Sequence, residues 1–224
     1  IMVAARPRST SYARRAMLRL PPALSPGDVV AVVAPSSPFP RDELLRGMAW
    51  LRLRYQLRAD PGMFARQAFL AGSDARRFEE LRTALADPEV KAIVAARGGY
   101  GAMRILDAVT PDALVARPKW LVGFSDVTAL HAVAWQAGLA SVHAPNVTGL
   151  GRDASPAQRA SWIGCLEQPG RRGAWSGLRI VHAGAARGLV VGGNLSLLHA
   201  MAAAGRLALP PGAVLAVEDV TEAP

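Results

Sequence analysis

The sequence is poor in several residue types, and each shortage excludes a class of protein. A single cysteine, Cys165, rules out an internal disulfide framework and fits a reducing compartment, so we expect a cytoplasmic protein. No apolar run is long enough to span a membrane, and no membrane partner is expected. The four histidines and the carboxylates form no cluster with metal-ligand spacing, so no metal site is predicted.

Lysine is almost absent, although the net charge is +9. Only Lys91 and Lys119 are lysines among the 26 basic residues. A basic chain is a first indication of nucleic-acid binding. Here the arginines are scattered and aromatic residues make up only 6% of the chain, so no stacking surface is indicated. We interpret the charge as a compositional bias toward arginine and predict no nucleic-acid partner.

The hydrophobic pattern predicts an α/β fold with a mainly parallel sheet flanked by helices. Apolar runs at residues 27–37, 90–96 and 119–123 are typical of parallel strands covered on both faces. Strands that alternate with helices favour this class. Further strands are expected at 55–59, 140–143, 178–182, 188–191 and 214–220. Helical spacing is found at 41–53, 75–86, 102–109, 111–116, 126–136, 153–166 and 192–204.

The composition divides the chain into four segments. Residues 1–24 form a basic leader that we expect to be disordered, and residues 25–150 form the α/β domain. Residues 151–177 are a linker rich in glycine, proline and arginine. Residues 178–224 begin a β-rich second domain. This domain is expected to be incomplete, because the chain stops soon after a predicted strand.

Ser125 lies at a sharp turn between a predicted strand and a predicted helix. The turn resembles the nucleophile elbow Gly-x-Ser-x-Gly, in which the serine hydroxyl is exposed at the sheet edge. The second glycine of that pattern is missing. A serine at a helix start is also often a simple cap, so both interpretations stay open on this motif alone.

A glycine-rich loop, Gly98-Gly99-Tyr100-Gly101, follows the strand at 90–96. If this strand neighbours the one before Ser125, the N–H groups of Gly99 and Asp126 converge on one oxygen. Such an oxyanion hole stabilises a transition state by roughly 3–4 kcal/mol per donor. The alternatives are a phosphate-binding or a purely structural turn. No Lys-Ser/Thr follows the glycines, which excludes a P-loop.

A serine nucleophile needs a base and an acid that orients the base. His131 shares a helix with Ser125 and is expected to point away from the turn, whereas His143 ends a strand and lies near the site. His182 and His199 are expected at the surface or in the core.

Glu218 and Asp219 close an apolar segment. Carboxylates there are costly unless they serve a site or find partners. A solvated pair on an edge strand is the alternative.

Together these motifs resemble the serine LD-carboxypeptidases, which include the cytoplasmic muramoyl-tetrapeptide carboxypeptidases and the microcin C immunity peptidases. Each motif alone is modest, but their number and order are specific. They are Gly-Asp at 27–28 with Ala-Pro-Ser at 34–36, Arg-Gly-Gly-Tyr-Gly at 97–101, Gly-Phe-Ser-Asp-Val-Thr at 123–128, His-Ala-Pro at 143–145, Gly-Gly-Asn-Leu at 192–195 and Val-Glu-Asp-Val at 217–220.

The resemblance implies a role for each matching residue. Ser125 matches the nucleophile and Glu218 matches the acid of a Ser-Glu-His triad. Gly99 and Asp126 match the region whose N–H groups form the oxyanion hole, with Gly98 as an alternative to Gly99. Substrate-binding positions are Gly98, His143 and Asn194. The residues that recognise a terminal carboxylate are unassigned, with Arg97 or Arg104 as unsupported candidates.

The resemblance also implies an activity. The family removes the terminal D-alanine from a murein tetrapeptide in peptidoglycan recycling, needs no metal or organic cofactor, and is usually homodimeric. One alternative is a self-immunity peptidase that cleaves a peptidyl-nucleotide antibiotic. Another is a non-catalytic binding module.

The family's triad histidine lies well beyond the Glu-Asp motif, and none of the four histidines here matches it. We therefore expect a fragment, rather than a protein completed by a separate chain or a decayed copy. As printed, the chain is not expected to be active.

Overall fold

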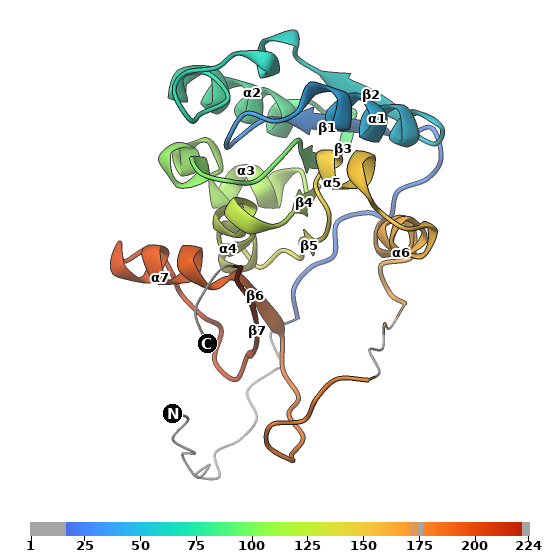
Figure 1. The fold of residues 1–224 in the computed structure, drawn as a ribbon. Helices are drawn as coiled ribbons and strands as arrows, with labels where there is room; N and C mark the ends of the chain where they lie inside the picture. The colour runs from blue at the N-terminus through green and yellow to red at the C-terminus, as the bar shows by residue number, and fades with distance from the viewer. Residues whose placement is uncertain (1–16, 172, 174–176, 221–224) are drawn as a thin grey trace.

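A five-stranded, all-parallel sheet lies at the centre of the fold, in the order β2-β1-β3-β4-β5 (Figure 1). The computed structural model describes residues 17–171, 173 and 177–220. The strands are β1 Val29–Val33, β2 Gln56–Ala59, β3 Val90–Ala95, β4 Trp120–Gly123 and β5 Val142–His143. This confirms the predicted α/β class, and it brings the loops after β1, β3 and β4 to one edge.

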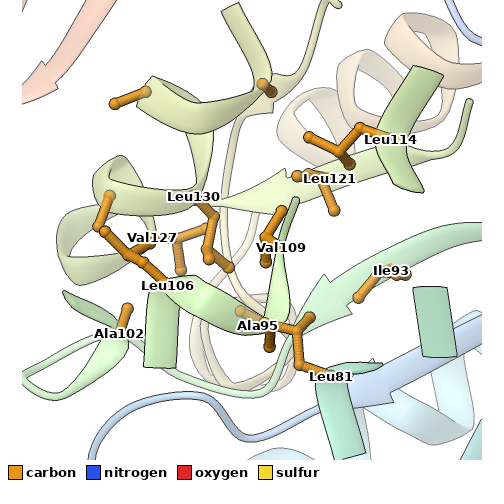
Figure 2. Packing of buried hydrophobic residues seen from close by; sticks show 14 of the residues in the cluster. Leu81, Ile93, Ala95, Ala102, Leu106, Val109, Leu114, Leu121, Val127 and Leu130 are labelled. Atoms are coloured by element: carbon orange, nitrogen blue, oxygen red, sulfur yellow. The ribbon is translucent and has the colours of Figure 1, made fainter. Parts of the chain in front are cut away.

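Both faces of the sheet are covered, which explains the uninterrupted apolar runs. Alternate residues of each strand enter two separate cores: Ile93 and Leu121 join one, and Val94 and Val122 join the other. Figure 2 shows part of the first core, where Leu121 lies beside Leu114 and Leu81 lies beside Ala95. Helices α2 Asp74–Ala86, α3 Pro111–Ala116 and α4 Thr128–Gln136, with the 3₁₀ helix η2 Ala102–Ala108, cover this face. Helices α1 Arg41–Arg52, α5 Val147–Arg152 and α6 Pro156–Glu167 cover the other.

Helix starts follow the expected capping chemistry. The Ser73 hydroxyl accepts a hydrogen bond from the Arg76 N–H at the start of α2. Ser155 and Gln158 form a capping box at α6, with Pro156 at the first helical position. Two short 3₁₀ helices, η1 Pro61–Phe64 and η3 Ser125–Val127, complete this part. Within the part of the chain that the structure describes, no helix is both long and apolar enough to cross a membrane.

A second, two-stranded parallel sheet lies beside α4 (Figure 1). It consists of β6 Val190–Asn194 and β7 Val214–Glu218, connected by α7 Leu195–Ala203. Val191, Leu198 and Met201 are buried in the same core as Ile93. The region thus begins as a β-α-β unit packed on the first sheet. The domain boundaries at 150 and 177 stay predictions.

Two expectations for this region are wrong. Residues 178–182 form no strand and are exposed, because they find no neighbour among the described strands. Residues 214–220 were expected to be buried, but Leu215 and Val217 are 49% and 50% exposed. An apolar run without alternation predicts a strand here, but it does not fix how many faces of that strand are covered.

The expected disordered leader is corrected for residues 17–24. Arg19 forms a parallel bridge with Leu139, and its N–H donates to the Gly138 carbonyl at 2.8 Å. Leu24 is 3% exposed, and its N–H donates to the Leu166 carbonyl at 2.9 Å. These contacts could not be predicted from the basic composition, because backbone groups rather than side chains form them. Residues 1–16 lie outside the described residues.

Candidate active site

Ser125 lies at the sharp turn that the sequence predicts. The chain leaves β4 at Gly123, turns through Phe124 and enters η3 and then α4. Ser125 has φ of +63°, and Ala68 is the one other described non-glycine residue with positive φ. Such a conformation costs about 1–3 kcal/mol, and it is concentrated at functional sites. The turn therefore has the geometry of a nucleophile elbow.

The Ser125 hydroxyl has no hydrogen-bond partner among the described residues. At the start of η3 and of α4, no backbone N–H donates to a capping side chain. The interpretation of Ser125 as a helix cap is therefore wrong. Its side chain is partly exposed and lines a cavity.

The glycine loop packs directly on this turn, because β3 and β4 are neighbours. A Cβ atom at Gly98 would lie 2.8 Å from Ser125 Cβ and 3.1 Å from its Oγ. Only a residue without a side chain permits this approach. Gly99 has φ of +106°, and a Cβ there would collide with Ser37. The condition for an oxyanion hole, adjacent strands, is met. The positions of its donors, the Gly99 and Asp126 N–H groups, stay a prediction.

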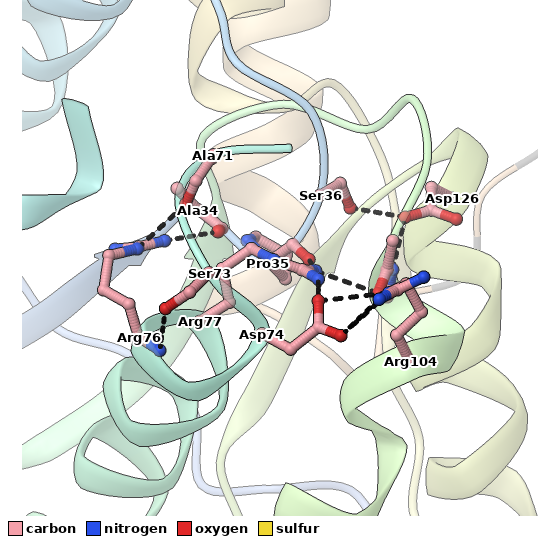
Figure 3. A network of polar contacts seen from close by, with 12 residues as sticks. Ala34, Pro35, Ser36, Ala71, Ser73, Asp74, Arg76, Arg77, Arg104 and Asp126 are labelled. Atoms are coloured by element: carbon pink, nitrogen blue, oxygen red, sulfur yellow. Dashed lines mark hydrogen bonds and ion pairs between the residues drawn. The ribbon is translucent and has the colours of Figure 1, made fainter. Parts of the chain in front are cut away.

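The Asp126 side chain also has a structural role, which the sequence analysis did not predict. It is 1% exposed and accepts hydrogen bonds from Ser36 Oγ at 2.6 Å and the Ala102 N–H at 2.7 Å (Figure 3). Burial raises the pKa of the Asp126 carboxyl, and these hydrogen bonds oppose that rise. One carboxyl thus joins the loops after β1, β3 and β4.

A buried arginine supports the same loops from α2. Arg77 is fully buried, and its guanidinium donates to the carbonyls of Pro35 and Gly101 and pairs with Asp74 (Figure 3). Asp74 also pairs with Arg104 at 2.6 Å, and these partners lower the pKa of the Asp74 carboxyl. Arg104 is therefore held in this network.

We expect Arg77→Met to lower the free energy of unfolding by about 3 kcal/mol, measured by urea denaturation. Methionine fills a similar volume but leaves the Pro35 and Gly101 carbonyls without their charged donor, and such bonds contribute about 1.5–3 kcal/mol each. Arg104→Met is the matched control. Its ion pair is partly exposed, so the loss should stay below about 1 kcal/mol. Equal losses would contradict the role given to Arg77.

The prediction that His131 points away from the turn is wrong. Its side chain lies against the end of β4. Its Nε2 is 2.9 Å from the Gly123 carbonyl and its Nδ1 is 2.8 Å from Ser141 Oγ. A carbonyl only accepts, so Nε2 carries the proton and Nδ1 accepts from the Ser141 hydroxyl. Burial lowers the His131 pKa to about 4, so the ring is neutral at pH 7. Both nitrogens are used, which makes His131 a structural residue.

Glu218 faces a cavity of about 460 Å³ at the end of β7, together with His143, Gly192 and Gly193. Burial lowers the pKa of His143, and the nearby Glu218 charge acts to raise it. The Oε1 atom of Glu218 is buried and has no hydrogen-bond partner among the described residues. A buried carboxylate oxygen without a donor is costly, because it has lost its hydrogen bonds to water.

Asp219, next in sequence, has the opposite surroundings. It accepts hydrogen bonds from Asn194 Nδ2 at 3.0 Å, the Ser196 N–H at 3.0 Å and Ser196 Oγ at 2.8 Å. These donors lower the pKa of its carboxyl. The two acids therefore differ: Asp219 is held by three hydrogen bonds, whereas Glu218 is partly exposed and has one buried carboxylate oxygen without a donor among the described residues.

Asn194 is held within the protein. Its Oδ1 accepts from the Leu197 N–H at 3.1 Å and so caps α7. Its own N–H donates to Thr128 Oγ1 at 2.9 Å. These bonds give Asn194 a positioning role, and its substrate-binding role stays a prediction. In the ranges that the structure describes, no group of three or more His, Cys, Asp or Glu could hold a metal ion.

The family follows from comparison with known sequences. Residues 30–144 match the model of the LD-carboxypeptidase N-terminal domain. The chain belongs to the LD-carboxypeptidase family.

Relatives within the LD-carboxypeptidase family extend the match beyond residue 144. A Streptomyces coelicolor protein with a carboxypeptidase name is 39% identical over 216 residues, which cover 90% of this chain and 68% of that protein. The murein tetrapeptide carboxypeptidase of Pseudomonas aeruginosa is 34% identical over 206 residues, which cover 86% of this chain and 66% of that protein. The chain spans about two thirds of the length of these relatives.

Solved structures share the LD-carboxypeptidase fold. The muramoyltetrapeptide carboxypeptidase from Oxalobacter formigenes is similar with a TM-score of 0.74 and 24% identity, over 87% of this chain and 66% of that one. The MccF-like protein from Bacillus anthracis has a TM-score of 0.78 and 22% identity, over 89% of this chain and 69% of that one. At these identities the likeness concerns the fold alone.

The structure places the predicted site residues of the LD-carboxypeptidase motifs at two cavities, one lined by Ser125, Gly98 and Gly99 and the other by His143 and Glu218. Gly98 contacts Ser125, while His143 and Glu218 line one cavity. His182 and His199 are exposed, as expected. Sequence reasoning missed Arg152, which lines a cavity with Ser125. An arginine in the last turn of a short helix gave no signal of a site.

Proposed function

We propose that the protein is a serine LD-carboxypeptidase that removes the terminal D-alanine from murein tetrapeptide. The observation that carries this proposal is Ser125 itself, with its positive φ, its unpartnered hydroxyl and the Gly98 backbone packed against it. The substrate is supported by the 34% identical murein tetrapeptide carboxypeptidase. A homodimer acting in the cytoplasm is part of the proposal and rests on the family resemblance.

The proposed reaction proceeds through an acyl-enzyme. Ser125 Oγ attacks the carbonyl before D-alanine, and the Gly99 and Asp126 N–H groups donate to the oxyanion. The serine proton passes through a base to the departing amine of D-alanine. Water then attacks the ester, the base takes a proton from that water, and this proton passes to Ser125 Oγ as the acyl–Oγ bond breaks.

The base is the remaining part of the proposal. His131 is excluded because both of its ring nitrogens are hydrogen bonded. We assign the base to a histidine from outside these 224 residues, oriented by Glu218. The buried, unpaired Oε1 of Glu218 supports this assignment, because it offers an acceptor for an imidazole N–H.

The test is to incubate the full-length protein with murein tetrapeptide and measure free D-alanine by chromatography. One D-alanine should be released per tetrapeptide, and a matched peptide that ends in L-alanine should stay intact. Faster turnover of a peptidyl adenylate would instead identify a self-immunity peptidase. Binding of tetrapeptide with no release, and no labelling of Ser125 by a fluorophosphonate, would support a non-catalytic module and contradict the proposal.

A further inference from the structure

A second cavity opens at Ser125 and carries two guanidinium groups. It has a volume of about 270 Å³, and Ser125, Gly98, Arg97 and Arg152 are among the described residues that line it. Arg97 precedes the glycine loop, and Arg152 is the last residue of α5. Glu43 is the one carboxylate among these lining residues, so two positive charges face one negative charge.

Both arginines line this cavity and have guanidinium nitrogens without a hydrogen-bond partner among the described residues. Arg97 uses Nη1 for the Pro38 carbonyl, which leaves its other guanidinium nitrogens available. Arg152 is 58% exposed, and its nearest carboxylate contacts are 3.4 Å to Asp153 and 4.0 Å to Glu43. Strong charge-assisted N–H···O bonds measure about 2.7–2.9 Å, so neither acid holds Arg152 firmly. Arg104, by contrast, is held by Asp74 and does not line the cavity.

The two cavities differ in charge. The cavity with Arg97 and Arg152 is cationic, whereas the cavity at the end of β7 contains the unpaired carboxylate of Glu218. A substrate carboxylate is repelled by Glu218 and attracted by the guanidinium groups. Pockets for drug-sized ligands measure about 300–1,000 Å³, so a cavity just below that range suits one small residue rather than a peptide.

We propose that Arg152, assisted by Arg97, binds the terminal carboxylate of the residue that the enzyme releases. A planar guanidinium matches a carboxylate with two parallel hydrogen bonds. The subsite would restrict cleavage to the last peptide bond, because an internal residue has no free carboxylate to offer. This inference rests on the proposed function and names the residues that select the last peptide bond.

The test compares two substrates in the full-length protein: murein tetrapeptide and the same peptide with a terminal D-alaninamide. Arg152→Gln should lower kcat/KM for the tetrapeptide by about 100-fold, mainly through KM, because a lost hydrogen bond to a charged group weakens binding on this scale. The same substitution should change kcat/KM for the amide less than about 3-fold, since the amide has no charge to lose. Arg82→Gln, on the exposed face of α2, is the matched control and should leave both values unchanged.

A binding experiment separates this inference from the proposed function. Calorimetry with Ser125→Ala and with the double variant Ser125→Ala/Arg152→Gln measures affinity for both peptides without turnover. The tetrapeptide should bind about 100-fold more tightly than the amide, and only when Arg152 is present. Equal affinities for the two peptides would overturn the carboxylate subsite even if D-alanine is released. If the tetrapeptide binds more tightly than the amide but no D-alanine is released, the proposed function is overturned and the carboxylate subsite is not.

Discussion

Replacing Ser125 with alanine is expected to lower D-alanine release from murein tetrapeptide by at least about 10⁴-fold, because nucleophile replacements in serine hydrolases have effects of this size. The hydroxyl has no structural partner whose loss would disturb the fold. Alanine keeps the Cβ atom that packs against Gly98 and tolerates the positive φ as well as serine does. The loss should appear in kcat, with the melting temperature unchanged.

Thr110→Ala is a matched control for this result. Thr110 is also a hydroxyl residue at a helix start, but its Oγ1 accepts a hydrogen bond from the Ala113 N–H at 3.2 Å and caps α3. Its loss should lower the free energy of unfolding by about 1 kcal/mol and leave D-alanine release unchanged. A Ser125→Ala variant that keeps a tenth of the activity would rule out Ser125 as the nucleophile.

Glu218→Gln is expected to lower kcat by about 10³–10⁴-fold in the full-length protein, because an orienting acid that loses its charge leaves the base in the wrong tautomer. Glutamine has the same size and shape as glutamate, so the lining of the cavity at the end of β7 stays unchanged. The buried Oε1 atom has no partner among the described residues, so the free energy of unfolding should change by less than about 1 kcal/mol.

The neighbouring acid provides the control for Glu218. Asp219→Asn weakens three hydrogen bonds at the start of α7, and it should lower the free energy of unfolding by about 1–2 kcal/mol. Its effect on kcat should be far smaller than that of Glu218→Gln. The reverse order, with Asp219 decisive for kcat and Glu218 for stability, would show that the two roles were assigned wrongly.

The sheet and the serine turn were predictable because their signals are local. A run such as Val90–Ala95 shows its burial in its own composition, and the Ser125 turn lies where a strand pattern changes to a helix pattern. The adjacency of β3 and β4 was only a condition in the sequence argument. The observed pairing of Ile93 with Leu121 meets it.

The network behind the turn was not predictable, because its partners are distant in sequence. Ser36 and Asp126 lie 90 positions apart, and a buried Arg77 resembles a surface helix residue when only the sequence is read. His131 was placed on the wrong side because helix periodicity does not show that the Gly123 carbonyl lies within reach. Tertiary contacts, rather than local preference, decide the position of such polar groups.

The bonds of Asn194 have a consequence for how this family can vary in length. Thr128 starts the helix after the Ser125 turn and accepts from the Asn194 N–H, while Asn194 in turn binds Asp219, next to Glu218. These hydrogen bonds connect the helix after Ser125 to the residue next to Glu218, and no residue between α6 and β6 takes part in them. Doubling the length of a loop adds only about 0.6 kcal/mol to the entropic cost of closing it, so insertions between α6 and β6 should destabilise the fold little. Length differences there should be common among homologues and should leave the Thr128–Asn194 and Asn194–Asp219 hydrogen bonds intact.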